Sequence, residues 1–188
     1  EALAELHMAD HRDDLIALRD HYLRRATPPA LDRARQRWFI DRVPLNETDL
    51  GLITLLFPES PLLYVVRHPL DVVLSCVSNL ITAGFNCAHA LETAARHYVL
   101  IADLVTHYRA ELTMPFLQIR YEDLVDDQEA TVRHVLAFIG EKFDPSCLAF
   151  TEKRRHASAR YRYRNYLPHL KPVIPILQQT IARLGYQV

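Results

Sequence analysis

The sequence predicts a three-layer α/β fold in which helices flank a parallel sheet. Short apolar runs at residues 62–66 and 115–119 read as strands, and near-continuous apolar runs are typical of strands buried on both faces of a parallel sheet. Long stretches of helical periodicity separate and follow these runs. The chain of 188 residues is 49% hydrophobic, which is enough for a core, and we expect a single domain over residues 1–188.

The first third of the chain is expected to be mainly helical. Residues 1–25 place leucines at helical spacing, and Thr27-Pro28-Pro29 ends this helix. A second helical piece extends to about Arg37. The segment Trp38-Phe39-Ile40 is β-prone, so it is expected to form a short strand with its tryptophan in the core. Residues 48–57 return to helical spacing.

From residue 62 onward, strands and helices are expected to alternate. Pro69 suits the first turn of a helix, and Asp71 favours the positive end of that helix. Either Asp126 or Asp127 is placed to cap a later helix, and Gly140 follows it. The helices are expected over residues 69–83, 88–112, 126–139 and after Lys171.

Composition excludes several classes of protein. No apolar run approaches the roughly 20 residues that a membrane span needs, and the acidic N-terminus does not read as a signal peptide. The three cysteines are too few and too scattered for a disulfide framework or a zinc site, which favours a reducing, cytoplasmic location. The four glycines do not cluster, so the sequence holds no Walker A loop and no dinucleotide fingerprint.

Charge is distributed unevenly along the chain. Residues 153–188 contain eight basic residues and no acidic one, although the net charge of the whole chain is −1. A basic C-terminal region suggests that the protein binds an anionic partner. In the alternative interpretation, these basic residues only form the solvated surface of a helix end. Arginines alternate there with Tyr161, Tyr163 and Tyr166, which superficially suits single-stranded nucleic acid, but we expect no nucleic-acid partner. We also expect no metal site.

Polar residues follow both predicted strands. Arg67 comes directly after the first strand, and ligands of open α/β sheets bind beyond the carboxyl ends of strands. Ser75 and Asn79 are four residues apart, so they share one face of the following helix and could complete a phosphate site with Arg67. In the alternative interpretation, Arg67 pairs with Asp71 and only fixes the turn.

The second strand is followed by Arg120-Tyr121-Glu122-Asp123. Tyr121 is a candidate to stack on a base, while Glu122 and Asp123 are candidates to orient a neighbouring arginine. The alternative is that both carboxylates belong to a polar turn and helix start.

These segments resemble the sulfotransferases that use 3′-phosphoadenylyl sulfate. Val66-Arg67-His68-Pro69-Leu70-Asp71 with Ser75 resembles their 3′-phosphate-binding segment, and Arg120-Tyr121-Glu122-Asp123-Leu124 resembles the strand motif that follows it. Residues 40–46 resemble the family's Asp-Lys-x-Pro-x-Asn segment, and residues 162–166 resemble its Arg-Trp-Arg-x-Tyr stretch. The nearest subgroup is the bacterial enzymes often fused to tetratricopeptide repeats and related to protein-tyrosine sulfotransferases.

The resemblance implies a P-loop-NTPase-like sulfotransferase fold, incomplete at its N-terminus. It implies transfer of a sulfuryl group from 3′-phosphoadenylyl sulfate to a hydroxyl acceptor, either a protein tyrosine or a small molecule, without a metal. A repeat domain on the same gene is a possible partner. The residues that it assigns to the nucleotide are Arg67, Ser75 and Asn79 at the 3′-phosphate, Tyr121 at the adenine, and Arg160 or Arg162 in a basic lid over residues 153–188.

Two features depart from the family's pattern. The Gly-rich loop that holds the 5′-phosphosulfate has no counterpart in this sequence, and Glu1 lies near the place of the family's catalytic base. Arg42 replaces the expected lysine, and a guanidinium stabilises charge but does not donate a proton near pH 7. The alternative function is therefore a catalytically incomplete relative that binds a nucleotide or a partner.

Overall fold

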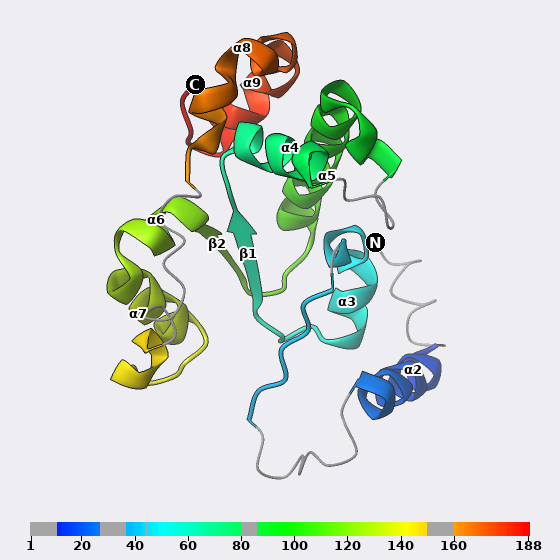
Figure 1. Ribbon diagram of the computed structural model, residues 1–188. Coiled ribbons are helices and arrows are strands. Elements are labelled where there is room, and N and C mark those ends of the chain that lie inside the picture. Colours follow the sequence, from blue (N-terminus) through cyan, green and yellow to red (C-terminus); the bar gives the residue numbers. More distant parts are fainter. Residues whose placement is uncertain (1–10, 27–36, 44, 80–85, 150–159) are drawn as a thin grey trace. The chain divides into compact units, whose positions relative to one another are not determined.

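The computed structural model describes residues 11–26, 37–43, 45–79, 86–149 and 160–188 (Figure 1). The chain divides into two compact units. The first comprises residues 1–60 and 108–114, and the second comprises residues 61–107 and 115–188.

The second unit contains a parallel pair of strands. Strand β1 (Leu62–Val66) pairs with β2 (Phe116–Arg120), with Leu62 opposite Phe116 and Val66 opposite Arg120. Parallel strands need a long crossover, and here the connection contains α4 (Pro69–Ser78), η2 (Asn86–His89) and α5 (Leu91–Glu111). The carboxyl ends of both strands therefore lie at one edge of the sheet.

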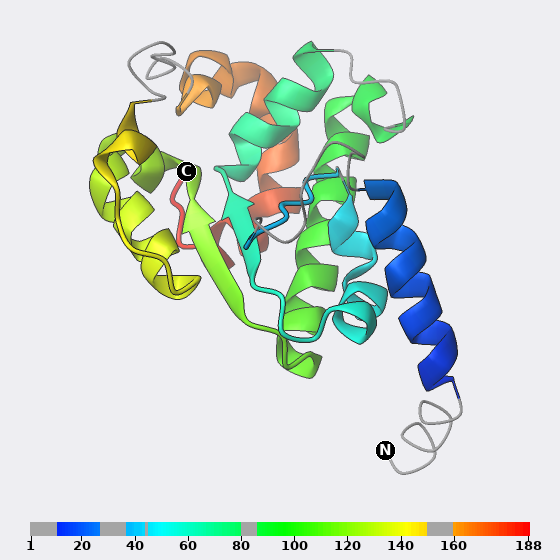
Figure 2. The ribbon, with the colours of Figure 1, turned by 90° about the horizontal axis from the view of Figure 1, so that it is seen from below.

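Helices lie on both sides of this strand pair. After β2 the chain forms α6 (Tyr121–Asp126), α7 (Gln128–Phe138) and η3 (Pro145–Leu148). Figures 1 and 2 show α6 and α7 on one side of the strands, and α4, α5 and the C-terminal helix α9 (Ile174–Arg183) on the other. The order helix, sheet, helix confirms the predicted three-layer α/β class.

Short helical turns lead to α9. They are η6 (Arg162–Tyr166), α8 (Leu167–Leu170) and η7 (Lys171–Val173). After α9, Gly185 adopts φ +77°, the N–H of Tyr186 donates to the carbonyl of Ile181 at 3.0 Å, and the N–H of Gly185 donates to Ala182 at 3.0 Å. These two bonds form a Schellman C-cap, which turns the chain back toward the strands.

The core of the second unit lies between β1, α4, α5 and the C-terminal helices. Leu70, Leu170 and Leu177 are each 0% exposed, and Val66 is 3% exposed. The remaining buried members of this cluster are Val73, Ala94, Ala95, Tyr163, Val173, Ile181 and Tyr186.

The other face of β1 is only partly covered. Leu63 and Val65 are 40% and 56% exposed, whereas Val66 is 3% exposed, because successive side chains of a strand point to opposite faces. The expectation that the first strand is buried on both faces is therefore wrong for this structure: α4, α5 and α9 cover one face of β1, while α6 follows β2.

The first unit contains α2 (Arg12–Ala26), η1 (Asn46–Thr48) and α3 (Leu50–Leu56). The Tyr22 hydroxyl donates a hydrogen bond to Asp41, and the Tyr22 ring meets Phe57 edge-on with centroids 5.7 Å apart. The predicted strand at residues 38–40 is wrong. That segment has no regular secondary structure, and Trp38 is 37% exposed because no strand pairs with it in the described chain.

Most other elements match the expectations from the sequence. Strand β1 has the predicted bounds, and β2 is shifted by one residue. The side chain of Asp127 caps α7, accepting the N–H of Ala130 at 3.0 Å. Helix α6 has Glu122 and Asp123 in its first turn, which matches the alternative interpretation of these carboxylates as part of a helix start. The expectations for residues 1–10, 27–36 and 80–85 lie outside the described residues. Within the described chain, no helix is both long and apolar enough to cross a membrane.

Leu177 provides a test of the core. Leu177→Ala should lower the free energy of unfolding by about 3 kcal/mol, because it removes a fully buried side chain and leaves a cavity. Gln178→Ala, at an exposed position of the same helix, is the control and should have little effect. Urea unfolding followed by circular dichroism measures both variants, and equal midpoints would contradict the described packing of α9.

Candidate functional site

Two polar turns meet where the parallel strands end. Val66 and Arg120 are paired at the ends of β1 and β2, so the segments that follow them are neighbours. The first continues as Arg67-His68-Pro69, which we call the arginine turn, and the second as Tyr121-Glu122-Asp123. This is the edge at which open α/β sheets bind ligands.

Asp71 holds the arginine turn from within α4. Its side chain is fully buried, and Oδ2 accepts a hydrogen bond from Nη2 of Arg67 at 3.1 Å. The backbone N–H of Tyr163 donates to Oδ1 at 2.8 Å. The Arg67–Asp71 pair of the alternative interpretation is therefore present. The same carboxylate also binds the backbone of Tyr163, which belongs to the basic C-terminal region of residues 153–188 (the basic segment).

Glu122 holds the same turn from α6, which directly follows the second strand. It is 1% exposed, and it accepts the backbone N–H of His68 at 3.1 Å and the hydroxyl of Tyr186 at 2.6 Å. Burial and the bond to Glu122 raise the pKa of Tyr186, so the hydroxyl keeps its proton and acts as a donor. These contacts of Glu122 are to a backbone N–H and a tyrosine, and its expected role in orienting an arginine stays a prediction.

His68 is buried in the centre of the turn. Its Nδ1 accepts the N–H of Leu70 at 3.2 Å, which caps α4, and Nε2 lies 3.0 Å from the carbonyl of Gln187. Because Nδ1 accepts a hydrogen bond and Nε2 faces a carbonyl oxygen, the proton is on Nε2 and the ring is the neutral Nε2–H tautomer. The ring stacks on Tyr163 with centroids 4.1 Å apart, and burial lowers the pKa of His68 despite the nearby carboxylates of Asp71 and Glu122.

Ser75 and Asn79 share one face of α4, as predicted. Nδ2 of Asn79 donates to Oγ of Ser75 at 3.1 Å and to the carbonyl of Ser75 at 2.9 Å. Asn79 is exposed and forms the C-cap of the helix, so this polar pair is accessible to solvent at the end of α4.

Arginine side chains stack on tyrosines around the turn. The Arg67 guanidinium carbon lies 5.2 Å from the centroid of Tyr121, and that of Arg120 lies 4.2 Å from the centroid of Tyr186. Nε of Arg120 is 4.0 Å from Oδ1 of Asp123. Asp123 thus lies beside an arginine of its own turn.

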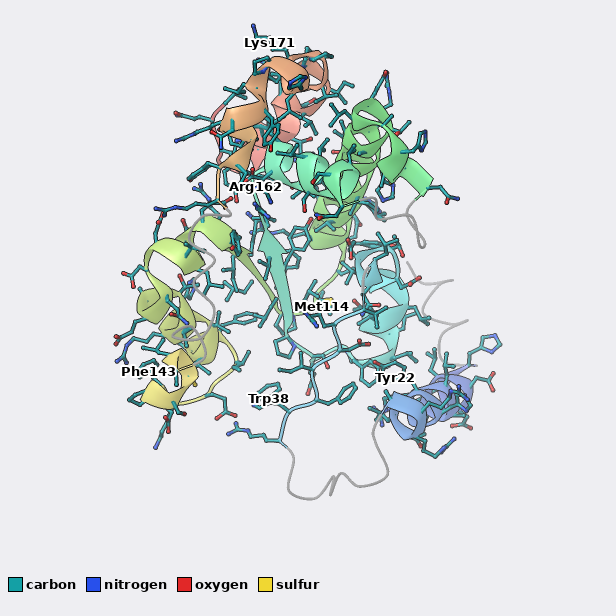
Figure 3. The ribbon with its side chains drawn as sticks, in the orientation of Figure 1. Tyr22, Trp38, Met114, Phe143, Arg162 and Lys171 are labelled. Carbon is teal, nitrogen blue, oxygen red and sulfur yellow. The ribbon has the colours of Figure 1, made fainter. Side chains whose placement is uncertain are left out.

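The basic segment reaches the same edge of the sheet. Arg160 forms an ion pair with Asp126, at the end of α6. Arg162, labelled in Figure 3, is exposed and precedes Tyr163, whose backbone binds Asp71. Tyr161 adopts a left-handed conformation with φ 54°, and its ring lies 4.5 Å below the guanidinium of Arg164.

The structure thus brings Arg67, Tyr121, Arg160 and Arg162 into one region of the second unit, with Ser75 and Asn79 along α4. Arg42 is exposed in the first unit, and Glu1 lies outside the described residues. Sequence reasoning missed Tyr186 and Gln187. The only available signal was the Gly185-Tyr186 pair after the last amphipathic helix, which is a typical helix end.

No group of three or more histidine, cysteine, aspartate or glutamate side chains suited to a metal ion occurs among the residues that the structure describes. The arrangement offers guanidinium groups at the strand ends and a hydroxyl and an amide toward the end of α4, donors of the kind that suit phosphate or sulfate groups.

Comparison with known proteins is consistent with this anion-binding character. A family model described as "Sulfotransferase family" matches residues 1–145. Sulfotransferase 2A1 of Rattus norvegicus is 28% identical over 136 residues, which cover 56% of this chain and 48% of the rat protein. An uncharacterized protein of Aquifex aeolicus (strain VF5) is 24% identical over 166 residues, covering 77% of this chain and 21% of that protein.

A solved structure shares the fold. The sulfotransferase domain from the curacin biosynthetic pathway matches with a TM-score of 0.52 and 24% identity, over 59% of this chain and 41% of that one. The chain therefore spans about half the length of the rat relative and a fifth of the Aquifex protein.

The lowered pKa of His68 predicts a loss of stability in acid. The unfolded chain takes up a proton on this histidine near pH 6.5, whereas burial resists that proton in the folded chain. The stability that the neutral ring contributes is therefore complete above pH 6.5 and should be lost as the pH falls toward the folded pKa.

NMR titration of the His68 ring, assigned with a His68→Gln variant, should give a pKa below 6.5. Urea unfolding should show a smaller loss of stability between neutral and mildly acidic pH for His68→Gln than for the parent chain. A ring with a pKa above 6.5 would mean that the hydrogen bond to the Gln187 carbonyl and the nearby carboxylates outweigh burial.

Proposed function

Because the chain belongs to the sulfotransferase family, we propose that it transfers a sulfuryl group from 3′-phosphoadenylyl sulfate to a hydroxyl acceptor. The observation that carries the proposal is the position of Arg67. It follows β1 at the ligand-binding edge of the sheet, within the part of the chain that the family model matches.

The 3′-phosphate is assigned to Arg67, Ser75 and Asn79. Asp71 holds the Arg67 guanidinium from a fully buried position, so the arginine is fixed before a ligand arrives. The hydroxyl of Ser75 and the amide of Asn79 are accessible near the end of α4, and both are suited to phosphate oxygens. Cationic and neutral donors together would bind a doubly charged phosphate more strongly than either type alone.

The adenine is assigned to Tyr121, with Arg160 and Arg162 as lid residues. Tyr121 already contacts the Arg67 guanidinium, which places an aromatic face next to the proposed phosphate site. Arg160 is held by Asp126, and the neighbouring Tyr163 backbone is held by Asp71, so both ends of this short segment are anchored to the site.

Sulfuryl transfer is expected to depend on positioning and on cations. The transferred group carries charge on its equatorial oxygens, as a phosphoryl group does, and cationic side chains stabilise that charge. We assign Arg42 to this role, as an electrostatic clamp without proton donation. Glu1 is the candidate for the base that removes the proton of the acceptor hydroxyl.

We further propose that both compact units belong to one sulfotransferase domain over residues 1–188, with residues 153–188 as its basic lid. The subgroup proposed is that of bacterial, cytoplasmic, tyrosine-sulfotransferase-like enzymes, and a protein tyrosine or a small hydroxyl compound is the acceptor. The motifs that resemble this subgroup support the proposal. A repeat domain on the same gene would be compatible with the same site.

A second candidate function is binding of the nucleotide or of a partner without transfer. It is favoured by one observation, namely that the four glycines of the sequence do not cluster into a loop able to hold the 5′-phosphosulfate. The two candidate functions share the nucleotide site and differ only in turnover.

Nucleotide binding provides the first test. Saturating 3′-phosphoadenosine 5′-phosphate should raise the melting temperature, since a ligand at 100 times its dissociation constant stabilises the folded chain by about 2.7 kcal/mol. Arg67→Ala should weaken binding by roughly ten- to a hundredfold, because it removes a charged donor to the phosphate. Titration calorimetry measures the affinity.

Arg96→Ala is the matched control for Arg67→Ala. Arg96 is an exposed arginine of the same unit and forms an i,i+4 pair with Glu92 at 2.9 Å, so its removal should leave the affinity unchanged. Equal affinities of the parent chain and Arg67→Ala would refute the phosphate assignment.

Turnover provides the second test. Incubation with ³⁵S-labelled 3′-phosphoadenylyl sulfate and a panel of phenols and tyrosine peptides should transfer label to an acceptor, and Arg42→Ala should reduce the rate by at least about tenfold, as loss of a charge-stabilising group does. Binding without transfer to any acceptor would favour the second candidate function.

A further inference from the structure

The residues after α9 make hydrogen bonds to two residues of the proposed nucleotide site. Tyr186 binds Glu122, and Gln187 binds His68, although both lie more than sixty residues from these partners in sequence. We propose that Tyr186 and Gln187 are positioning residues for the 3′-phosphate, acting through the arginine turn. The inference rests on the proposed function.

Tyr186 acts through a buried carboxylate. Its hydroxyl donates to Oε2 of Glu122 at 2.6 Å, while Oε1 of Glu122 accepts the backbone N–H of His68 at 3.1 Å. The two oxygens of one carboxylate thereby join Tyr186 to the residue next to Arg67. A buried carboxylate needs its donors, so loss of the hydroxyl forces Glu122 to move or to draw in water, and the His68 backbone moves with it.

Gln187 acts through the imidazole. Its carbonyl accepts Nε2–H of His68 at 3.0 Å, which leaves Nδ1 as the acceptor for the first turn of α4. Helix α4 also presents Ser75 and Asn79. The two contacts therefore act on both parts of the phosphate site: the turn that carries Arg67 and the helix that carries the serine and the asparagine.

Tyr186 is itself held firmly. It is 5% exposed, the Schellman cap at Gly185 directs it toward the strands, and the Arg120 guanidinium lies over its ring at 4.2 Å. The helix cap, the stacked guanidinium and the carboxylate together fix Tyr186. A residue fixed in this way can hold the arginine turn in one position. Phosphate recognition by a guanidinium depends on such placement, since the N–H groups must match the oxygens.

The test compares two ligands that differ only in the 3′-phosphate. Tyr186→Phe keeps the ring and removes the hydroxyl. It should weaken 3′-phosphoadenosine 5′-phosphate about tenfold, the cost of one hydrogen bond to a charged group, while changing the affinity for adenosine 5′-phosphate less than about twofold. Glu122→Gln should show the same pattern. NMR titration with millimolar nucleotide measures both ligands.

Tyr108→Phe is the matched control. It removes a hydroxyl that donates to the carbonyl of Thr48 at 3.3 Å in the first unit, and it should leave both affinities unchanged. Far-UV circular dichroism and urea unfolding check that each variant is folded at the assay temperature. If Tyr186→Phe fails this check, Glu122→Gln alone decides the test.

Each outcome has one meaning. Selective loss of affinity for the nucleotide with a 3′-phosphate supports the positioning role. Equal losses for both nucleotides would show that the hydroxyl stabilises the fold without positioning Arg67, and unchanged affinities would show that it does neither, so both results overturn the inference. A parent chain that binds neither nucleotide would overturn the proposed function itself.

Discussion

The arginine turn depends on two buried carboxylates. Burial of a carboxylate costs several kcal/mol unless hydrogen bonds replace the lost water, so each must keep its donors in place. Asp71 is satisfied by Arg67 and by the backbone of Tyr163, and Glu122 by the backbone of His68 and by Tyr186. The positions of α4, of the basic segment and of the C-terminal residues are all tied to these four bonds.

The hydrogen bonds of Asp71 and Glu122 hold the fold together and also place the arginines that would bind an anionic ligand. Asp71 and Glu122 are the carboxylates that hold the turn, and the guanidinium groups of Arg67 and Arg120 stack on Tyr121 and Tyr186 beside them. The site therefore combines buried carboxylates, which fix backbone and side chains, with partly exposed guanidinium groups. The proposed nucleotide, which carries phosphate and sulfate groups, would add its negative charge where these arginines gather.

Local sequence was sufficient for the strands and for one side of the site. The apolar run of β1 and the parallel topology place Arg67 and Tyr121 at one edge, and the spacing of four residues places Ser75 and Asn79 on one helix face. The contacts of Tyr186 and Gln187 could not be predicted, because no local pattern specifies a partner so distant in the chain. The strand expected at residues 38–40 failed because β-propensity does not supply a pairing partner.

The bond between His68 and Gln187 spans 119 residues, and this separation has a consequence for biosynthesis. At ribosomal rates of ~5–20 residues per second, the acceptor for the imidazole is made on the order of ten seconds after the histidine. Until then His68, Glu122 and the core-facing side of β1, which includes Val66, lack the C-terminal cover. The nascent chain thus exposes an unfinished polar turn and an apolar strand together, which is the state that chaperones bind.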